Sequence, residues 1–434
     1  MSNNTESARE RVVIIGGGFA GLNVIKHLDK KKFDITLIDR NNFHSFPPLF
    51  YQIASGGLDP GNISFPFRRE LRRQANGLGA VYHMGEVHTI DTLYKEVRTQ
   101  FETIEYDKLI IAAGTTNNFF NNPGLIKTVF TMKSAAEATR CRNEILDRLE
   151  RASLCTDDPD RRRRLLSFVV VGGGPTGVEM AGAIGEMKRY IISREYPGIK
   201  PEDVQIVLLE GTGRLLGGMS EQSSTAALKA LESLMVDVRL NKLMSSYDDN
   251  VVTLNDGTKI YSEMVIWTAG VTGEKFLFNG VDYAQGRGNR FEVDQQNRVI
   301  GLEDVFAIGD IALMQTPDYP KGHPQMAQVA IQQGRLLAKQ LNAGKFDKSF
   351  KYVDKGSMAT VGRNLAVADL KHIHMKGWTA WMAWMFVHLI SLLGMRNKLT
   401  VLINWVWNYV TYSTSLRILL HSTKFPLRRR WGEM

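Results

Sequence analysis

Residues 12–21 read VVIIGGGFAG and residues 168–177 read FVVVGGGPTG, so one pattern occurs twice in a chain of 434 residues. In each copy an apolar run rich in β-branched residues leads into three glycines, and a further glycine follows where a helical pattern begins. This order predicts a buried strand, a tight turn and a helix. A second apolar strand ending in an acid follows each copy, at Asp39 and at Glu210. The sequence therefore predicts an α/β fold with two Rossmann-like βαβ units.

The glycines of each motif have separate roles. The first permits the tight turn, the second lets the backbone approach a pyrophosphate, and the third lets the helix pack closely on the strand. The helix that follows offers unpaired N–H groups and a positive dipole end to the phosphates. The glycines at these positions are Gly16, Gly18 and Gly21 in the first motif and Gly172, Gly174 and Gly177 in the second. Two such motifs predict two dinucleotide sites, and hence electron transfer between two cofactors.

The acid at the end of each second strand bears on the choice of nucleotide. Asp39 and Glu210 are placed to accept hydrogen bonds from ribose hydroxyls. The charge of Glu210 would repel a 2′-phosphate, so the second site favours NADH over NADPH. Arg214 lies close to it in sequence and moderates that preference.

Length and composition limit the function classes. At roughly 150 residues per domain the chain has room for two to three domains, and 44% hydrophobic with 23% charged residues is typical of a folded globular protein. The formal charge of +9 would suit an anionic partner. No aromatic residues interleave the run Arg161 to Arg164, which favours a solvated stretch, and we expect no nucleic-acid partner. The polar N-terminus predicts neither a signal peptide nor a transit peptide.

The cysteine count excludes thiol chemistry. Cys141 and Cys155 are the two cysteines, too far apart for a CxxC pair and too few for a four-cysteine zinc site. We expect no metal site. Electrons from the two cofactors must therefore leave for a diffusible acceptor, which is a quinone, oxygen or a small electron-transfer protein.

A later strand, residues 305–310 (VFAIGD), ends in Gly-Asp after both glycine motifs. Together these features resemble the two-dinucleotide-binding-domain flavoproteins. The resemblance implies that Asp310 holds the ribityl chain of FAD, that the first motif binds FAD and that the second binds NADH. It also implies a discontinuous FAD domain. We expect an FAD-binding domain over residues 1–117 and 285–345, an NADH-binding domain over residues 118–284 and a C-terminal membrane-docking module over residues 346–434.

The C-terminal part contains two segments rich in Trp, Met, Leu and Tyr. At about 100° per residue, one face of the first segment gathers the bulky residues Trp378, Trp381, Met382, Met385, Leu389, Leu392 and Leu393. The second segment has a polar stripe of Thr400, Asn404, Asn408, Thr411 and Ser415, with Trp405, Tyr409 and Tyr412 on its remaining surface. Basic residues flank both segments, so we expect amphipathic helices lying on an anionic lipid surface. A transmembrane hairpin and a dimer interface or buried core are the alternatives.

Three further stretches resemble the type II NADH:quinone oxidoreductases, the single-subunit NADH dehydrogenases of respiratory membranes that do not pump protons. They are residues 48–56 (PLFYQIASG), residues 327–334 (AQVAIQQG) and residues 394–408 (GMRNKLTVLINWVWN). The resemblance implies that Gln328 and Gln332, one helical turn apart, hydrogen-bond a quinone beside the flavin. It also implies that Glu179 lies near nicotinamide and quinone. We hypothesise that Glu179 orients the nicotinamide or relays protons to the quinone.

The resemblance implies hydride transfer from NADH to FAD and two-electron reduction of a membrane quinone without proton pumping. We expect Glu179, Gln328 and Gln332 to be catalytic. The expected cofactor-binding residues are Gly16, Gly18, Phe19, Ala20, Gly21, Asp39, Arg40, Val87, Ala113, Gly114, Asp310, Ala327, Gly172, Gly174, Thr176, Gly177, Glu210 and Gly270. We expect a peripheral protein on the cytoplasmic face of a respiratory, bacterial inner membrane, and leave a homodimer open. A soluble reductase of a ferredoxin-like carrier and a signalling protein that holds flavin and NADH are the alternatives.

Overall fold

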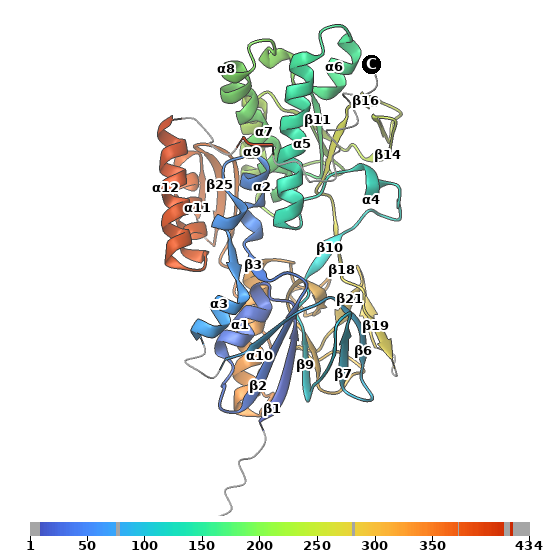
Figure 1. Cartoon of the computed structure of the whole chain (residues 1–434), viewed down its shortest axis with the longest axis vertical. Helices are drawn as coiled ribbons and strands as arrows, with labels where there is room; N and C mark the ends of the chain where they lie inside the picture. Colours follow the sequence, from blue (N-terminus) through green and yellow to red (C-terminus); the bar gives the residue numbers. More distant parts are fainter. Residues whose placement is uncertain (1–8, 75–78, 280–282, 372, 412–416, 420–434) are drawn as a thin grey trace, which may run out of the picture. The chain divides into compact units, whose positions relative to one another are not determined.

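The computed structural model describes residues 9–74, 79–279, 283–371, 373–411 and 417–419. The chain divides into two compact units, each assembled from separate stretches (Figure 1). The first unit comprises residues 1–45, 64–116 and 271–355, and the second comprises residues 46–63, 117–270 and 356–434. The predicted α/β fold, in which one Rossmann-like part is inserted in the other, is confirmed because residues 117–270 interrupt the first unit.

The first unit is built on a five-stranded parallel sheet. In spatial order its strands are β22 (Val305–Ala307), β9 (Lys108–Ile111), β1 (Glu10–Ile15), β2 (Phe33–Asp39) and β5 (Val81–Met84). Alternate residues of the central strand β1 point to opposite faces, so Val12 and Ile14 join one apolar core and Val13 and Ile15 the other. The packed pair α1 (Phe19–His27) and α10 (Ala327–Ala343) contributes to the first core.

The second core of this unit lies under a smaller sheet. Its strands are β19 (Leu277–Asn279), β6 (Val87–Asp91), β7 (Glu96–Thr99) and β8 (Thr103–Glu105). Other elements of the unit are β3 (Phe43–Ser45), β4 (Ser64–Pro66), α3 (Phe67–Gln74), β18 (Val271–Gly273), β20 (Gln285–Gly286), β21 (Arg290–Glu292) and β23 (Ala312–Leu313).

The second unit repeats the strand, turn and helix arrangement. Its parallel sheet has the order β13 (Asp237–Leu240), β12 (Gln205–Glu210), β11 (Ser167–Val171) and β17 (Met264–Trp267). Other elements are α2 (Phe50–Ala54), α4 (Leu125–Thr128), α5 (Ala135–Leu154), α6 (Pro159–Leu165), α9 (Glu221–Ser233), β14 (Met244–Asp248), β15 (Val251–Leu254) and β16 (Lys259–Tyr261). Helix α7 (Pro175–Met187) follows β11 and runs directly into a π-helical turn, Lys188–Ile192, and then α8 (Ser193–Glu195).

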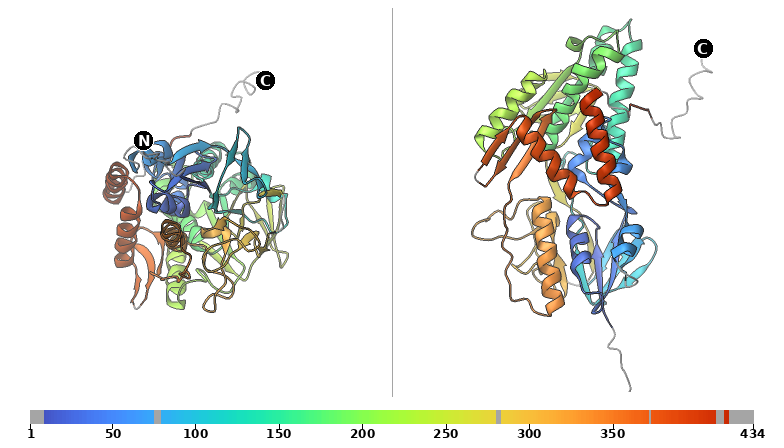
Figure 2. Two further views of the ribbon diagram at one scale, coloured as in Figure 1. Left: turned by 90° about the horizontal axis from the view of Figure 1, so that it is seen from below. Right: turned by 90° about the vertical axis from the view of Figure 1, so that its left-hand side faces the viewer.

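The C-terminal segment packs inside the second unit. It forms the antiparallel strands β24 (Ser357–Gly362), β25 (Leu365–Leu370) and β26 (Ile373–Lys376), followed by the adjacent helices α11 (Trp378–Ser391) and α12 (Met395–Thr411) (Figure 2). Strand β24 lies against α7 so closely that a Cβ on Gly182 would be 1.6 Å from the carbonyl oxygen of Val361. The C-terminal segment and the second glycine motif therefore share one packed structure.

Helix α11 exposes apolar side chains, and only part of the bulky face that periodicity predicted is among them. Its buried residues are Ala380 and Trp384. Trp381 and Met385, expected on the same face as Trp378, line a pocket, and Leu392 is buried. The exposed apolar residues are Trp378, Met382, Phe386, Val387 and Ile390. The predicted face is divided in this way because α11 is apolar around most of its circumference, so periodicity alone cannot select the side that packs on β25.

Helix α12 turns polar side chains toward the protein and apolar ones outward. Asn397 donates to the carbonyl of Asn62 at 2.9 Å, and Asn408 donates to that of Gly57 at 3.3 Å. Trp405, expected on the outer surface, is buried. The exposed apolar residues include Met395, Leu399, Leu402, Ile403, Val406, Trp407 and Val410. Tyr412 and Ser415 lie outside the described residues.

Neither of these helices, nor any other helix in the described part of the chain, has the length and apolar run needed to cross a membrane.

Candidate functional site

The first glycine-rich loop connects β1 to α1. Gly16 has a φ of +98°, and a Cβ there would lie 2.5 Å from the carbonyl oxygen of Ala112, next to β9. A Cβ on Gly21 would lie 2.1 Å from the carbonyl oxygen of Gly16. Asp39, at the end of β2, accepts a hydrogen bond from the Gly17 N–H at 2.7 Å. The loop is thus fixed both by the close packing that only glycine allows and by the acid.

The second glycine-rich loop, between β11 and α7, repeats these contacts. Gly172 has a φ of +111°, and a Cβ on Gly177 would lie 1.8 Å from the Gly172 carbonyl oxygen. Glu210, at the end of β12, accepts from the N–H groups of Gly173 at 2.6 Å and Thr212 at 2.7 Å. The two loops therefore have the same architecture, as the two motifs predicted.

The middle glycine of each motif has no structural reason to be glycine within the chain. Gly18 and Gly174 are exposed, both have a φ of −73°, and an added Cβ would meet no atom within 4 Å. With glycine at these two positions, no side chain occupies the space in front of the N-termini of α1 and α7. A pyrophosphate lying against the backbone accounts for this, because it needs that space. The residues present at both loops therefore fit a dinucleotide.

The Gly-Asp pair of the first unit lies in a short 3-10 turn after β22. Gly309 has a φ of +74°, and its N–H donates to the side-chain oxygen of Gln333 on α10 at 2.7 Å. A Cβ on Gly309 would lie 3.2 Å from the Cβ of Ala20. Asp310 therefore lies beside the start of α1, at the same carboxyl edge of the sheet as the first glycine loop.

Gln328 and Gln332 lie in the first two turns of α10 and bind the chain that follows the helix. Gln332 donates to the Val353 carbonyl at 2.9 Å and accepts from the Val353 N–H at 3.0 Å. Gln328 accepts from the Lys355 N–H at 3.1 Å. In this structure both side chains thus fasten residues 353–355 to the helix.

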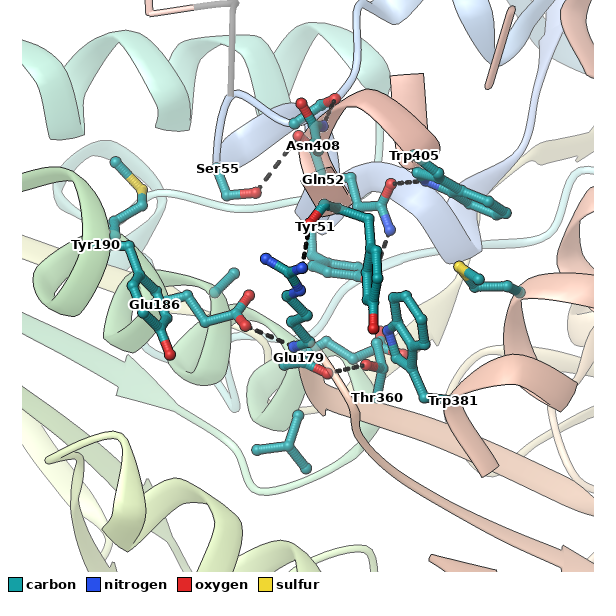
Figure 3. Close-up of a pocket in the computed structure, with 18 of the residues that line it drawn as sticks. Tyr51, Gln52, Ser55, Glu179, Glu186, Tyr190, Thr360, Trp381, Trp405 and Asn408 are labelled. Carbon is teal, nitrogen blue, oxygen red and sulfur yellow. Dashed lines mark hydrogen bonds between the residues drawn. The ribbon is translucent and has the colours of Figure 1, made fainter. Parts of the chain in front are cut away.

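The second unit contains a pocket lined from several segments that are distant in the sequence (Figure 3). Its aromatic residues are Tyr51, Tyr190, Trp381, Trp384, Trp405 and Tyr409, and its polar residues include Gln52, Ser55, Glu179, Glu186, Arg363 and Asn408. They come from α2, from α7 and its π-helical turn, from β24 and the turn after it, and from α11 and α12. A mainly apolar wall with a few placed polar groups is typical of a small-molecule site.

Two carboxyl groups of α7 enter this pocket on the same side of the helix. Glu179 is 9% exposed and accepts a hydrogen bond from the Thr360 N–H. Burial raises the pKa of Glu179 well above its usual value. Burial also raises the pKa of Glu186 to about 7, although the N–H and the charge of Arg363 oppose this. The uncharged form of Glu179 therefore persists to higher pH than that of an exposed glutamate, and the uncharged form does not repel the pyrophosphate expected at the start of α7.

A hydrogen-bonded chain enters the pocket from α12. The indole N–H of Trp405 donates to the side-chain oxygen of Gln52 at 2.8 Å, and the amide nitrogen of Gln52 donates to the hydroxyl oxygen of Tyr51 at 2.8 Å. Sequence reasoning missed Tyr51, Gln52, Glu186 and Trp405 as site residues. Residues 48–56 were noticed only as a resemblance, and nothing in the sequence pairs them with α12.

Comparisons with known proteins agree with this architecture. The family profile described as pyridine nucleotide-disulphide oxidoreductase matches residues 10–334, and that of the NDH2 C-terminal domain matches residues 355–411. The type II NADH:quinone oxidoreductase Ndh of Mycobacterium tuberculosis is 36% identical over 93% of this chain and 89% of its own. NdhA of the same organism is 37% identical over 92% of this chain and 86% of its own.

The chain belongs to the type II NADH:quinone oxidoreductases. It is an FAD-dependent NADH dehydrogenase whose electron acceptor is a quinone, as predicted. The solved structure of NDH2 from Plasmodium falciparum in complex with NADH has the same fold, with a TM-score of 0.87 at 24% identity over 95% of this chain and 100% of that one. When bound, FAD supplies the hydride acceptor and electron carrier of such an enzyme.

The predicted cofactor residues of this NADH:quinone oxidoreductase are divided between the two units. In the first unit Val87 begins β6, Ala327 begins α10 and Arg40 pairs with Glu274 at 3.2 Å. Ala113 and Gly114 follow β9, and Phe19 and Ala20 begin α1. In the second unit Thr176 is exposed in the first turn of α7, and Gly270 follows β17 with a φ of +76°. Glu179 belongs to the second unit, whereas Gln328 and Gln332 belong to the first.

Proposed function

We propose that this NADH:quinone oxidoreductase binds a lipid surface through the exposed sides of α11 and α12 and takes its quinone from the lipid into the pocket of Tyr51 and Glu179. The reaction consumes NADH, one proton and a quinone, and gives NAD⁺ and a quinol without proton pumping. The observation that supports this proposal is that the same two helices line the pocket and expose apolar residues. Trp381 of α11 lines the pocket, whereas Phe386 of the same helix is 65% exposed.

The proposal includes the roles of the predicted residues. The first glycine loop, Asp39 and Asp310 hold FAD, and the second loop and Glu210 hold NADH. Glu179 orients the nicotinamide or relays a proton to the quinone. Gln328 and Gln332, which belong to the first unit, keep the role of quinone ligands that the resemblance implies.

Lipid is the covering that suits the exposed faces of α11 and α12. Contiguous apolar surface is rarely left in water by a monomeric protein, and two adjacent helices carry it here. Exposed cations, Lys371, Lys376 and Arg396, lie next to these helices in the chain, where they would meet anionic headgroups. We place the docking face on the cytoplasmic leaflet of a respiratory membrane.

Aspartate substitutions on the outer faces test the docking. Phe386→Asp and Ile403→Asp replace residues that are 65% exposed, so we expect both variants to keep the fold. Each substitution removes an apolar side chain whose burial in lipid would contribute about 1.5–3 kcal/mol to binding. We therefore expect at least about tenfold weaker binding to phosphatidylglycerol vesicles. Turnover of a water-soluble short-chain quinone should persist, and turnover of a long-chain quinone in vesicles should fall.

The matched control is Phe101→Asp, which changes a phenylalanine of the first unit that is 68% exposed and lies outside both helices. It should sediment with vesicles as the unchanged protein does. Equal vesicle binding by all of these variants would contradict the docking assignment.

A further inference from the structure

The direction of one hydrogen-bonded chain in the pocket follows from chemistry alone. The indole N–H of Trp405 donates and cannot accept, so the group facing it on Gln52 must be the amide oxygen. The NH₂ group of Gln52 then lies on the other side, where it donates to the hydroxyl oxygen of Tyr51 at 2.8 Å. Because this bond uses an acceptor site of the tyrosine oxygen, the proton of Tyr51 points away from Gln52.

The hydroxyl of Tyr51 keeps this proton. Tyr51 is 9% exposed and lines the pocket together with Glu179 and Glu186. Burial, and after it the charge of Glu179, raise the pKa of Tyr51 well above its usual value. The hydroxyl therefore remains a hydrogen-bond donor at every pH below the usual pKa of a tyrosine. Figure 3 shows Tyr51, Glu179 and Trp381 around the same cavity.

We propose that Tyr51 is the hydrogen-bond donor to the quinone carbonyl in this pocket, with Gln52 and Trp405 as positioning residues that set the direction of its proton. The inference rests on the proposed function, in which the pocket takes the quinone. A quinone carbonyl only accepts hydrogen bonds, so a pocket that presents a fixed donor is complementary to it. As the quinone gains electrons, its oxygen becomes more negative and the bond strengthens, which favours the transition state over the bound substrate.

The hydrogen-bonded chain from Trp405 through Gln52 to Tyr51 also gives α12 a second role. Trp405 is buried and directs Gln52, while Ile403 and Trp407, two residues to either side, are 65% and 60% exposed. Helix α12, which we propose lies in lipid, therefore also determines the direction of the Tyr51 proton at the quinone site. A shift of α12 would release Gln52, and with it the direction of the Tyr51 proton.

Tyr51→Phe removes the donor with little change in shape. We expect the rate of quinone reduction, kcat, to fall about 100-fold, the lower end of the range for losing one such donor. Reduction of bound flavin by NADH, followed by absorbance in a stopped-flow instrument, should stay unchanged. Tyr247→Phe is the matched control, because Tyr247 is a buried tyrosine of the same unit that donates to the Ser262 carbonyl outside the pocket. Equal quinone turnover by Tyr51→Phe and Tyr247→Phe would overturn the proposal.

Gln52→Glu tests the direction of the chain rather than the presence of the hydroxyl. A carboxylate accepts from both Trp405 and Tyr51, so it would turn the tyrosine proton away from the quinone. We expect Gln52→Glu to lower kcat by at least about tenfold, and the double variant with Tyr51→Phe to be no slower than Tyr51→Phe alone, because neighbouring residues that act through one bond are not additive. If instead the reductions in kcat caused by the two substitutions multiply in the double variant, the two residues act separately and the proposed direction is rejected.

Ala183→Phe separates this inference from the proposal on which it rests. Ala183 lines the pocket one helical turn after Glu179, and a phenyl ring there would fill it. If Ala183→Phe leaves quinone turnover unchanged while FAD is retained, the pocket is not the quinone site and both proposals fail. If Ala183→Phe blocks quinone turnover but Tyr51→Phe does not impair it, the pocket stands and only the role of Tyr51 is rejected.

Discussion

Two glutamates on one helix differ in their chemistry because their surroundings differ. Glu179 is held by the Thr360 N–H in a buried position, whereas Glu186 is only partly buried and lies next to the positive charge of Arg363. Both carboxyls have a raised pKa because burial disfavours the charged form. The pocket thus has two carboxyls that release their protons at higher pH than exposed glutamates do, and the pKa of Glu186 is about 7, which suits a reaction that consumes a proton.

Glu186→Gln should make the stability of the protein less sensitive to pH. In the folded protein the pKa of Glu186 is raised from 4.5 to about 7, so between these values the folded state binds more protons than the unfolded state. The unchanged protein therefore loses stability as the pH rises through this range, and the loss is complete above about pH 7. Because Glu186 is partly exposed, we expect about 1–2 kcal/mol.

The measurement is the unfolding temperature of both holoproteins at about pH 5 and about pH 8. The advantage of Glu186→Gln over the unchanged protein should be larger at the higher pH. Glu202→Gln, which alters an exposed glutamate of the same unit, supplies the background. An advantage that is the same at both pH values would contradict the assigned cause.

At the scale of elements, the contact between α7 and β24 shapes the pocket wall. Gly182→Ala places a methyl group 1.6 Å from the Val361 carbonyl oxygen, which forces helix and strand apart. We expect a loss of about 1–3 kcal/mol in the free energy of unfolding, as for other overpacked sites. A higher KM for quinone should accompany it, because Thr360 and Glu179 lie on the two sides of this contact.

Gly218→Ala is the control, because a Cβ at Gly218 would meet no atom within 4 Å. Thermal unfolding and quinone titration of the two variants make the comparison. If Gly182→Ala were as stable as Gly218→Ala, the close packing of α7 on β24 would be refuted.

Elements built from adjacent residues could be predicted from the sequence. The glycine loops and the acids Asp39 and Glu210 were predicted because strand, turn and helix follow one another along the chain, and their spacing reflects local geometry. The pocket could not be predicted, because Tyr51, Glu186 and Trp405 come from segments that only tertiary packing brings together. The outer side of α11 could be predicted only in part, because Trp378 and Met382 of the predicted face are exposed while apolar residues surround most of the helix.

At the scale of the whole molecule, charge and apolar surface should act together in membrane binding. The formal charge is +9, and salt shortens the reach of charges from about 10 Å at 0.1 M to about 3 Å at 1 M. We expect high salt to weaken binding to anionic vesicles without abolishing it, because the exposed faces of α11 and α12 still insert. Co-sedimentation with anionic and with zwitterionic vesicles at both salt levels would measure this. Complete release by salt would instead indicate a purely electrostatic attachment.

The C-terminal segment is also part of the core of the second unit. Strand β24 covers α7 beside the second glycine motif, and Trp384 is 1% exposed in the interior of this unit. Removing residues 356–434 would therefore uncover the core of the second unit, in addition to removing the helices that we propose dock on lipid. Point substitutions on the outer faces isolate membrane binding, whereas truncation combines it with loss of folding.

The outward-facing apolar side of α12 has a practical consequence for purified material. Without lipid, Ile403, Val406 and Val410, which are 56% to 71% exposed, are left in water, and we expect a second copy of the chain to compete for this apolar surface. A dimer formed in this way would occupy the surface that a membrane needs. Sedimentation in plain buffer and in mild detergent would then give different masses, and the detergent value would describe the species that meets its quinone.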